Sequence, residues 1–163
     1  MRARPPRLRA AAARLAATIL TPPVHHWILR QERKILSNGR PLNRGEQAGT
    51  RDIGLSDAAR VRVLVVDRIP LPARWLWQRI ARFSRAILGD PVALTAGHGI
   101  FLCLGRRDNL AVLRHELVHV LQYERLGSRA FLQQYIHDGL LHGYFDSPLE
   151  AEARRLSINA LHD

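Results

Sequence analysis

Cysteine is almost absent from this chain of 163 residues, since Cys103 is the only one. A single cysteine permits no disulfide within the chain and no zinc cluster built from several thiolates. Because Cys103 lies in the apolar run 100–104, we expect it to act as a small buried hydrophobe. The composition otherwise suits one globular domain, with 47% hydrophobic and 24% charged residues.

Long apolar runs are also lacking. The most apolar stretch near the N-terminus, residues 10–20, is interrupted by Arg14 and followed by Pro22 and Pro23. It is too short to span a bilayer, and it makes a poor signal peptide. We therefore expect a protein without a transmembrane helix that is cytoplasmic or bound peripherally to a membrane.

Acidic residues are scarce at the start of the chain. Residues 1–40 contain nine Arg and Lys and a single acid, Glu32, whereas residues 41–163 contain sixteen basic and thirteen acidic residues. Most of the net charge of +11 therefore belongs to the first segment. We interpret residues 1–42 as a basic N-terminal arm with helical character and residues 43–163 as the main domain.

Four apolar residues of the arm share one face if the arm is helical: Leu8, Ala12, Leu15 and Ile19. An amphipathic helix with basic flanks can lie on the protein itself or on a membrane surface. We interpret the arm as solvated, because no aromatic-interleaved basic motif accompanies it. Weak contact of the arm with anionic lipid or nucleic acid is the alternative.

The order of the expected elements favours an α+β fold, because strands precede the longest helices without regular alternation. Helices are expected at 24–36, at 73–88, from a cap at Asp108 or Asn109 to about 126 with Gly127 as the stop, from Ser128 to about 141, and from Ser147-Pro148 onward. Strands are expected at 61–66 and within 92–104, which reads as strand, turn, strand, and a loop is expected at 43–55.

The segment 114–120 carries the chemistry, with the sequence RHELVHV. His115 and His119 are four residues apart, so on a helix they lie on one face and can bind one Zn²⁺. Glu116 follows the first histidine and is placed to take a proton from water at the metal. This is the HExxH pattern of zinc hydrolases, and it falls within an expected helix. We predict a zinc-dependent hydrolase with Glu116 as general base.

A third protein ligand is needed, and the sequence leaves two readings for it. Gln122 and Arg125 stand where the HExxHxxGxxH class requires glycine and histidine, so that class is excluded. Glu150 and Glu152 lie on the last expected helix, but their directions differ by about 200°, so only one can face the metal. Glu150 is preferred, although Ser147 and Glu150 also have the spacing of a capping box.

The stretches LRHELVHVLQYERLG and YFDSPLEAEAR resemble the zincin metallopeptidases whose third ligand is glutamate, and look closest to small bacterial predicted metallopeptidases. ALTAGHGIFL is similar to the strand segment of that family. The resemblance implies a compact zincin-like domain with a small sheet packed beside the active-site helix, zinc held by His115, His119 and Glu150, and a peptide or protein substrate.

One residue departs from the family pattern. Arg154 stands where the resemblance implies an aspartate that steadies a zinc-binding histidine. Arginine cannot accept a hydrogen bond, so a backbone carbonyl or another acid is expected to replace it. A catalytically silent zinc-binding or protein-interaction module with the same fold is therefore the alternative to the hydrolase.

Overall fold

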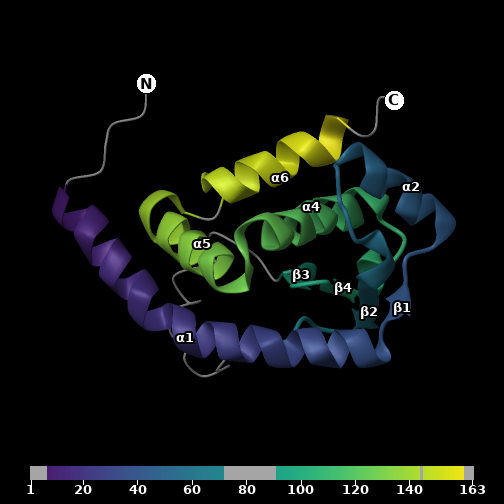
Figure 1. Ribbon diagram of the computed structural model, residues 1–163, viewed down its shortest axis with the longest axis horizontal. Helices are drawn as coiled ribbons and strands as arrows, with labels where there is room; N and C mark the ends of the chain where they lie inside the picture. The colour runs from purple at the N-terminus through teal and green to yellow at the C-terminus, as the bar shows by residue number, and fades with distance from the viewer. Residues whose placement is uncertain (1–6, 72–90, 144, 160–163) are drawn as a thin grey trace.

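The computed structural model describes residues 7–71, 91–143 and 145–159 (Figure 1). The helix expected at 73–88 lies outside these residues. The described part is an α+β fold, as the sequence predicts, with five α-helices and a four-stranded mixed sheet. None of its helices is long and apolar enough to cross a membrane.

The sheet has the strand order β1-β2-β4-β3. Its strands are β1 (Arg40–Pro41), β2 (Arg62–Val66), β3 (Ala93–Ala96) and β4 (Gly99–Cys103). β2 and β4 are parallel, and the other two pairs are antiparallel. β3 and β4 form a hairpin through Gly97 and His98, and Gly97 has a φ of 57°. A side chain at Gly97 would also collide with the carboxylate of Glu32, so the turn requires glycine.

Helices cover both faces of the sheet (Figure 1). Side chains alternate between the faces of a strand, so neighbouring residues of β4 enter different cores. Ile100 and Leu102 pack with Leu117 of helix α4 (Leu110–Leu126), whereas Phe101 packs with Ile35 of helix α1 (Arg7–Asn38). The HExxH segment on α4 is thereby held against one face and the N-terminal helix against the other.

Helix α1 is a single helix, where the sequence predicted two short ones separated near residue 22. Pro22 and Pro23 lie inside it. Each proline removes a backbone hydrogen bond of the helix, which normally ends or kinks it. Packing along α5 (Ser128–His142) and the sheet holds the two halves together, with Ile28 and Ile35 in the core. The division at residue 42 into arm and domain stays a prediction.

Helix α2 (Arg44–Asp52) replaces the loop expected at 43–55. Its start is a capping box: the Asn43 side chain accepts from the Glu46 N–H, and the Glu46 carboxylate accepts from the Asn43 N–H. Arg40 adds a two-point ion pair to Glu46, with N–O distances of 2.8 Å. These contacts satisfy the helix start and outweigh the low helix propensity of the two glycines.

Three helices at the C-terminal end frame the site: α4, α5 and α6 (Pro148–Asn159). Asn109, one of the two expected caps, caps α4 through a 3.1 Å bond from the Val112 N–H. Ser128 does not cap α5, because Gly127 occupies the cap position and Ser128 is already helical. Pro148 is the first residue of α6, where its missing N–H costs nothing. α6 packs along α4, so side chains of the two helices can contact one another.

Candidate metal centre

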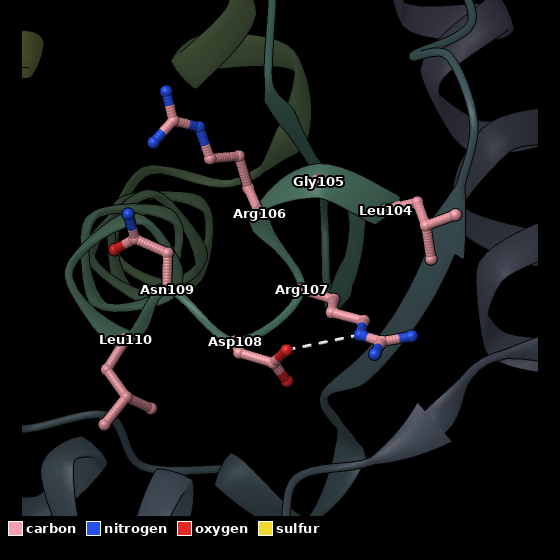
Figure 2. A pocket seen from close by; sticks show the side chains of 7 residues that line it. All are labelled: Leu104, Gly105, Arg106, Arg107, Asp108, Asn109 and Leu110. Carbon is pink, nitrogen blue, oxygen red and sulfur yellow. Dashed lines mark hydrogen bonds and ion pairs between the residues drawn. The ribbon is translucent and has the colours of Figure 1, made fainter.

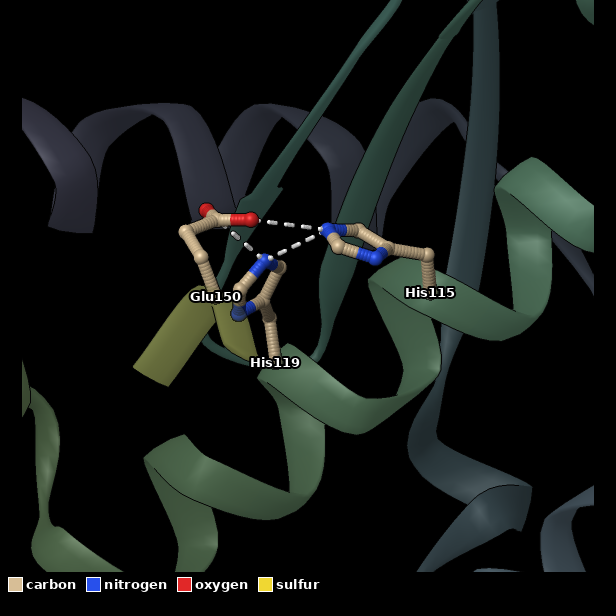
Figure 3. Close-up of side chains that lie close together, drawn as sticks. All are labelled: His115, His119 and Glu150. Atoms are coloured by element: carbon tan, nitrogen blue, oxygen red, sulfur yellow. Dashed lines mark hydrogen bonds and ion pairs between the residues drawn. The ribbon is translucent and has the colours of Figure 1, made fainter. Parts of the chain in front are cut away.

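Three ligand-type side chains from two helices converge at one point (Figure 3). His115 and His119 lie one turn apart on α4, and their Nε2 atoms are 3.1 Å apart. Glu150 comes from α6, with Oε2 3.2 Å from His115 Nε2 and Oε1 3.4 Å from His119 Nε2. Among the His, Cys, Asp and Glu side chains of the described residues, these three form the group whose arrangement could hold a metal ion.

The spacing of these three side chains fits a metal. Tetrahedral zinc with ligand distances of about 2.0–2.1 Å separates its ligand atoms by about 3.3–3.4 Å, close to the separations observed here. Glu150 is 1% exposed, and its Oε2 atom is buried without a hydrogen-bond donor. A buried carboxylate oxygen without a donor is costly unless a cation meets it. Two imidazole nitrogens and one carboxylate oxygen suit zinc and other first-row divalent ions.

Gln122 orients His119. Its side-chain oxygen lies 2.8 Å from His119 Nδ1, so Nδ1–H donates to it and Nε2 is the nitrogen that faces His115 and Glu150. The Gln122 amide group in turn donates to Leu149 O and to Glu152 Oε2, both at 2.9 Å. Because these two acceptors fix the direction of the amide, the orientation of Gln122 follows from its surroundings. Gln122 is completely buried.

His119 has a hydrogen-bond partner that does not involve position 154. The acceptor for His119 is neither the backbone carbonyl nor the acid that we expected, but a side-chain amide three residues further along α4. A signal existed in the sequence, because residues three apart on a helix are neighbours. Arg154 donates to the backbone oxygen of Phe145, and its Nη1 lies 4.0 Å from Glu150 Oε2.

Glu150 faces the histidines and not the start of its own helix. Its carboxylate contacts His115, His119, Arg154 and Tyr135, whose hydroxyl donates to Oε1 at 2.7 Å. Burial alone would raise the pKa of Glu150, but the neighbouring imidazoles of His115 and His119 and the hydroxyl of Tyr135 lower it, so the carboxylate is ionised. The hydroxyl of Ser147 is buried and has no partner among the described residues, so it does not form a capping box.

Glu152 points elsewhere. Its two oxygens each lie 2.8 Å from the guanidinium of Arg125, and this pairing lowers the pKa of Glu152. Its other contact is Gln122. Glu152 therefore lies behind the site, in contact with the residue that orients His119.

Glu116 is tied to the edge of the sheet. The hydroxyl of Thr95, on β3, donates to Glu116 Oε2 at 2.6 Å and lies 3.2 Å from the Glu116 backbone oxygen. Glu116 is 8% exposed. The contact fixes the rotation of its carboxylate and links the helix of the HExxH segment to strand β3.

Two surface hollows are separate from this centre. One, of about 530 Å³, is lined by residues 104–110 at the turn before α4, where Arg107 pairs with Asp108 at 3.2 Å (Figure 2). The other, of about 370 Å³, lies between α1 and α5. Their lining residues include none of the three metal-type ligands.

Comparison of the chain with protein-family models, with curated proteins and with solved structures finds no match. The case for a function therefore comes from the residues and contacts described above.

Proposed function

We propose that the chain is a zinc-dependent hydrolase of the HExxH class that acts as a metallopeptidase. The observation that carries the proposal is the convergence of His115, His119 and Glu150 on one point, with separations that suit a tetrahedral ion. Zinc catalytic sites combine three protein ligands with an open position for water or substrate. The zincin-like fold and the resemblance to Glu-type zincins belong to the same proposal.

The proposed chemistry divides the work between the ion and Glu116. Bound at this centre, zinc would polarise a substrate carbonyl and lower the pKa of water. Glu116 takes the proton of the attacking water and delivers it to the leaving nitrogen, acting first as base and then as acid. The Thr95 hydrogen bond holds the Glu116 carboxylate in place for both transfers.

A peptide is the proposed substrate because of the position of β3. This strand is at the end of the described sheet, and its Thr95 contacts Glu116. An extended peptide can add to a free strand edge through backbone hydrogen bonds. Such pairing would lay the peptide alongside the HExxH helix. The same centre is chemically able to hydrolyse other amides and esters.

Metal content tests the site. Purified wild-type protein is dialysed, and zinc per molecule is measured by elemental analysis, together with Glu150→Ala and Glu152→Ala. We expect one zinc in the wild type, a marked loss in Glu150→Ala, and retention in Glu152→Ala, because Glu152 reaches the site only through Gln122. If none of the three proteins contains zinc, the proposal is refuted.

Activity tests the reaction. Glu116→Gln keeps the size of the side chain and an oxygen that can accept from Thr95, but it removes the base. We expect the variant to bind zinc as the wild type does and to lose cleavage of an unstructured protein substrate, with loss of general acid–base catalysis contributing about 10²–10⁴-fold. Equal cleavage by both proteins would contradict the assigned role of Glu116.

A silent zinc-binding module is the second candidate, and Arg154 favours it. The guanidinium of Arg154 lies 4.0 Å from Glu150 Oε2, and a cation so close competes with a metal for the same carboxylate. Such a module would bind zinc yet cleave nothing, and Glu116→Gln would leave its effect in cells unchanged. The activity experiment therefore separates the two candidates.

A further inference from the structure

The first half of α1 has an apolar face that no other described element covers. Its large side chains are Leu8, Leu15 and Ile19, which are 86%, 63% and 63% exposed. Ala12 is exposed between them. Intervals of three and four residues place these four side chains, here called the outward stripe, along one side of the helix. Burial of aliphatic side chains in a nonpolar phase is favourable, so we expect the outward stripe to bind a nonpolar surface.

The opposite side of the same helix segment is already occupied. Ala13, Ala17 and Thr21 are buried, and α1 packs against α5 (Figure 1). The helix is thus formed and held before anything meets the outward stripe. A partner would meet a rigid surface and would not have to order a flexible segment.

The charges around the outward stripe are all of one sign. Arg7 and Arg9 are exposed beside it, Arg14 is exposed on the side of the helix towards α5, and further along α1 Arg30 and Arg33 are exposed as well. The first acidic residue of the whole chain is Glu32, whose carboxylate accepts a hydrogen bond from the His98 N–H. This helix surface therefore attracts anions and carries no carboxylate that repels them before residue 32.

We propose that the outward stripe of α1 binds the surface of an anionic lipid bilayer. Leu8, Leu15 and Ile19 enter the boundary between headgroups and acyl chains, and the neighbouring arginines contact lipid phosphates. Aliphatic residues flanked by arginine on a preformed helix have the design of an interfacial helix. A nucleic acid would use the arginines but offers no nonpolar phase for three exposed aliphatic side chains, so the bilayer is the better fit.

Vesicle binding by the full 163-residue protein tests the inference, independently of the metal centre. We expect binding to vesicles of equal parts phosphatidylcholine and phosphatidylglycerol, and much weaker binding to pure phosphatidylcholine. Replacing the large residues of the outward stripe should weaken binding to the anionic vesicles by about tenfold or more. The apolar variant is Leu8→Gln, Leu15→Gln, Ile19→Gln. Removing the flanking charges should weaken binding by a similar factor and flatten its dependence on salt. The charge variant is Arg7→Gln, Arg9→Gln, Arg14→Gln.

A matched control replaces three aliphatic residues that are similarly exposed on other elements: Leu104→Gln, Leu110→Gln, Ile158→Gln. This control should bind anionic vesicles as the wild type does, and circular dichroism should show equal helix content in all variants. Equal weakening in the control, or no vesicle binding by the wild type, would overturn the inference. Binding of a single-stranded oligonucleotide by a wild type that ignores vesicles would also overturn it and assign the arginines to nucleic acid.

Discussion

Replacement of Gln122 by methionine tests how the site is held, because the two side chains have similar size and only one forms hydrogen bonds. In Gln122→Met, His119 Nδ1–H loses its acceptor and Leu149 O loses its donor. Glu152 keeps its two-point pairing with Arg125. The change therefore acts on the orientation of His119 and on the junction between α4 and α6.

Two magnitudes follow. Loss of an outer partner of a metal-binding histidine typically costs about 10–100-fold in metal affinity, equivalent to about 1.4–2.8 kcal/mol. Each buried polar group left without a partner also costs about 1–3 kcal/mol of folding stability. The metal-free variant should therefore unfold more easily, and the zinc affinity of its folded form should fall by the factor given above.

Competition with a chromophoric chelator measures the zinc affinity, at a temperature where both metal-free proteins are folded. Val61→Ala is the control, because Val61 is completely buried in the core between the sheet and α4 and is not among the hydrogen-bond partners of Gln122. Its loss of packing costs about 1.5–3 kcal/mol, yet zinc affinity should be unchanged. If Gln122→Met and Val61→Ala bind zinc equally well, Gln122 is only a packing residue and the reasoning is refuted.

Three further predictions concern the surroundings of the site. Tyr135→Phe removes the hydrogen bond to Glu150 and should lower zinc affinity by about 3–10-fold, read by the same competition, since such a bond contributes about 0.5–1.5 kcal/mol. Asn43→Ala removes a helix cap and should cost about 1 kcal/mol in denaturant unfolding without changing zinc affinity. The carboxylates of Glu32, 3.8 Å from Nδ1, and Glu124, 3.2 Å from Nε2, raise the pKa of His98 above 6.5. The stabilisation from the charged imidazole is therefore complete below pH 6.5 and is lost as pH rises through the raised pKa. Contact with His98 lowers the pKa of Glu32 below 4.5. The stabilisation that the Glu32 carboxylate contributes is therefore lost only as pH falls through that lowered pKa. Wild-type stability relative to His98→Gln should thus be greatest between about 4.5 and 6.5 and decline above, as measured by urea unfolding across pH.

The elements that local rules define were predictable. The helix of the HExxH segment has a cap at Asn109 and a stop at Gly127, and both act as the sequence indicates. The strand at 61–66 and the hairpin within 92–104 were likewise evident from β-branched alternation and a glycine turn. Because His115 and His119 lie on one helix, their proximity follows from helix geometry alone.

Features that depend on packing between distant segments were not predictable. Nothing local indicates that α1 continues through Pro22 and Pro23, since the compensation comes from α5, more than a hundred residues away in sequence. The direction of Glu150 depended on how α6 meets α4, so spacing alone left a capping box equally open. The α2 helix differs, because its capping signal, Asn43 followed by Glu46, was present in the sequence. The nearby glycines nevertheless led to the prediction of a loop.

The contact between α4 and α6 has a consequence for the chain as a whole. A metal bound by His119 and Glu150 would close a covalently continuous loop that contains all of α5. It would thus act as a reversible cross-link, reducing the entropy of the unfolded chain as a disulfide does in proteins that have two cysteines to spare. Since α5 also packs along α1, the cross-link would span a helix that contacts the N-terminal helix as well. Because the chain has a single cysteine and cannot form an internal disulfide, a bound metal would be the cross-link available to the described fold.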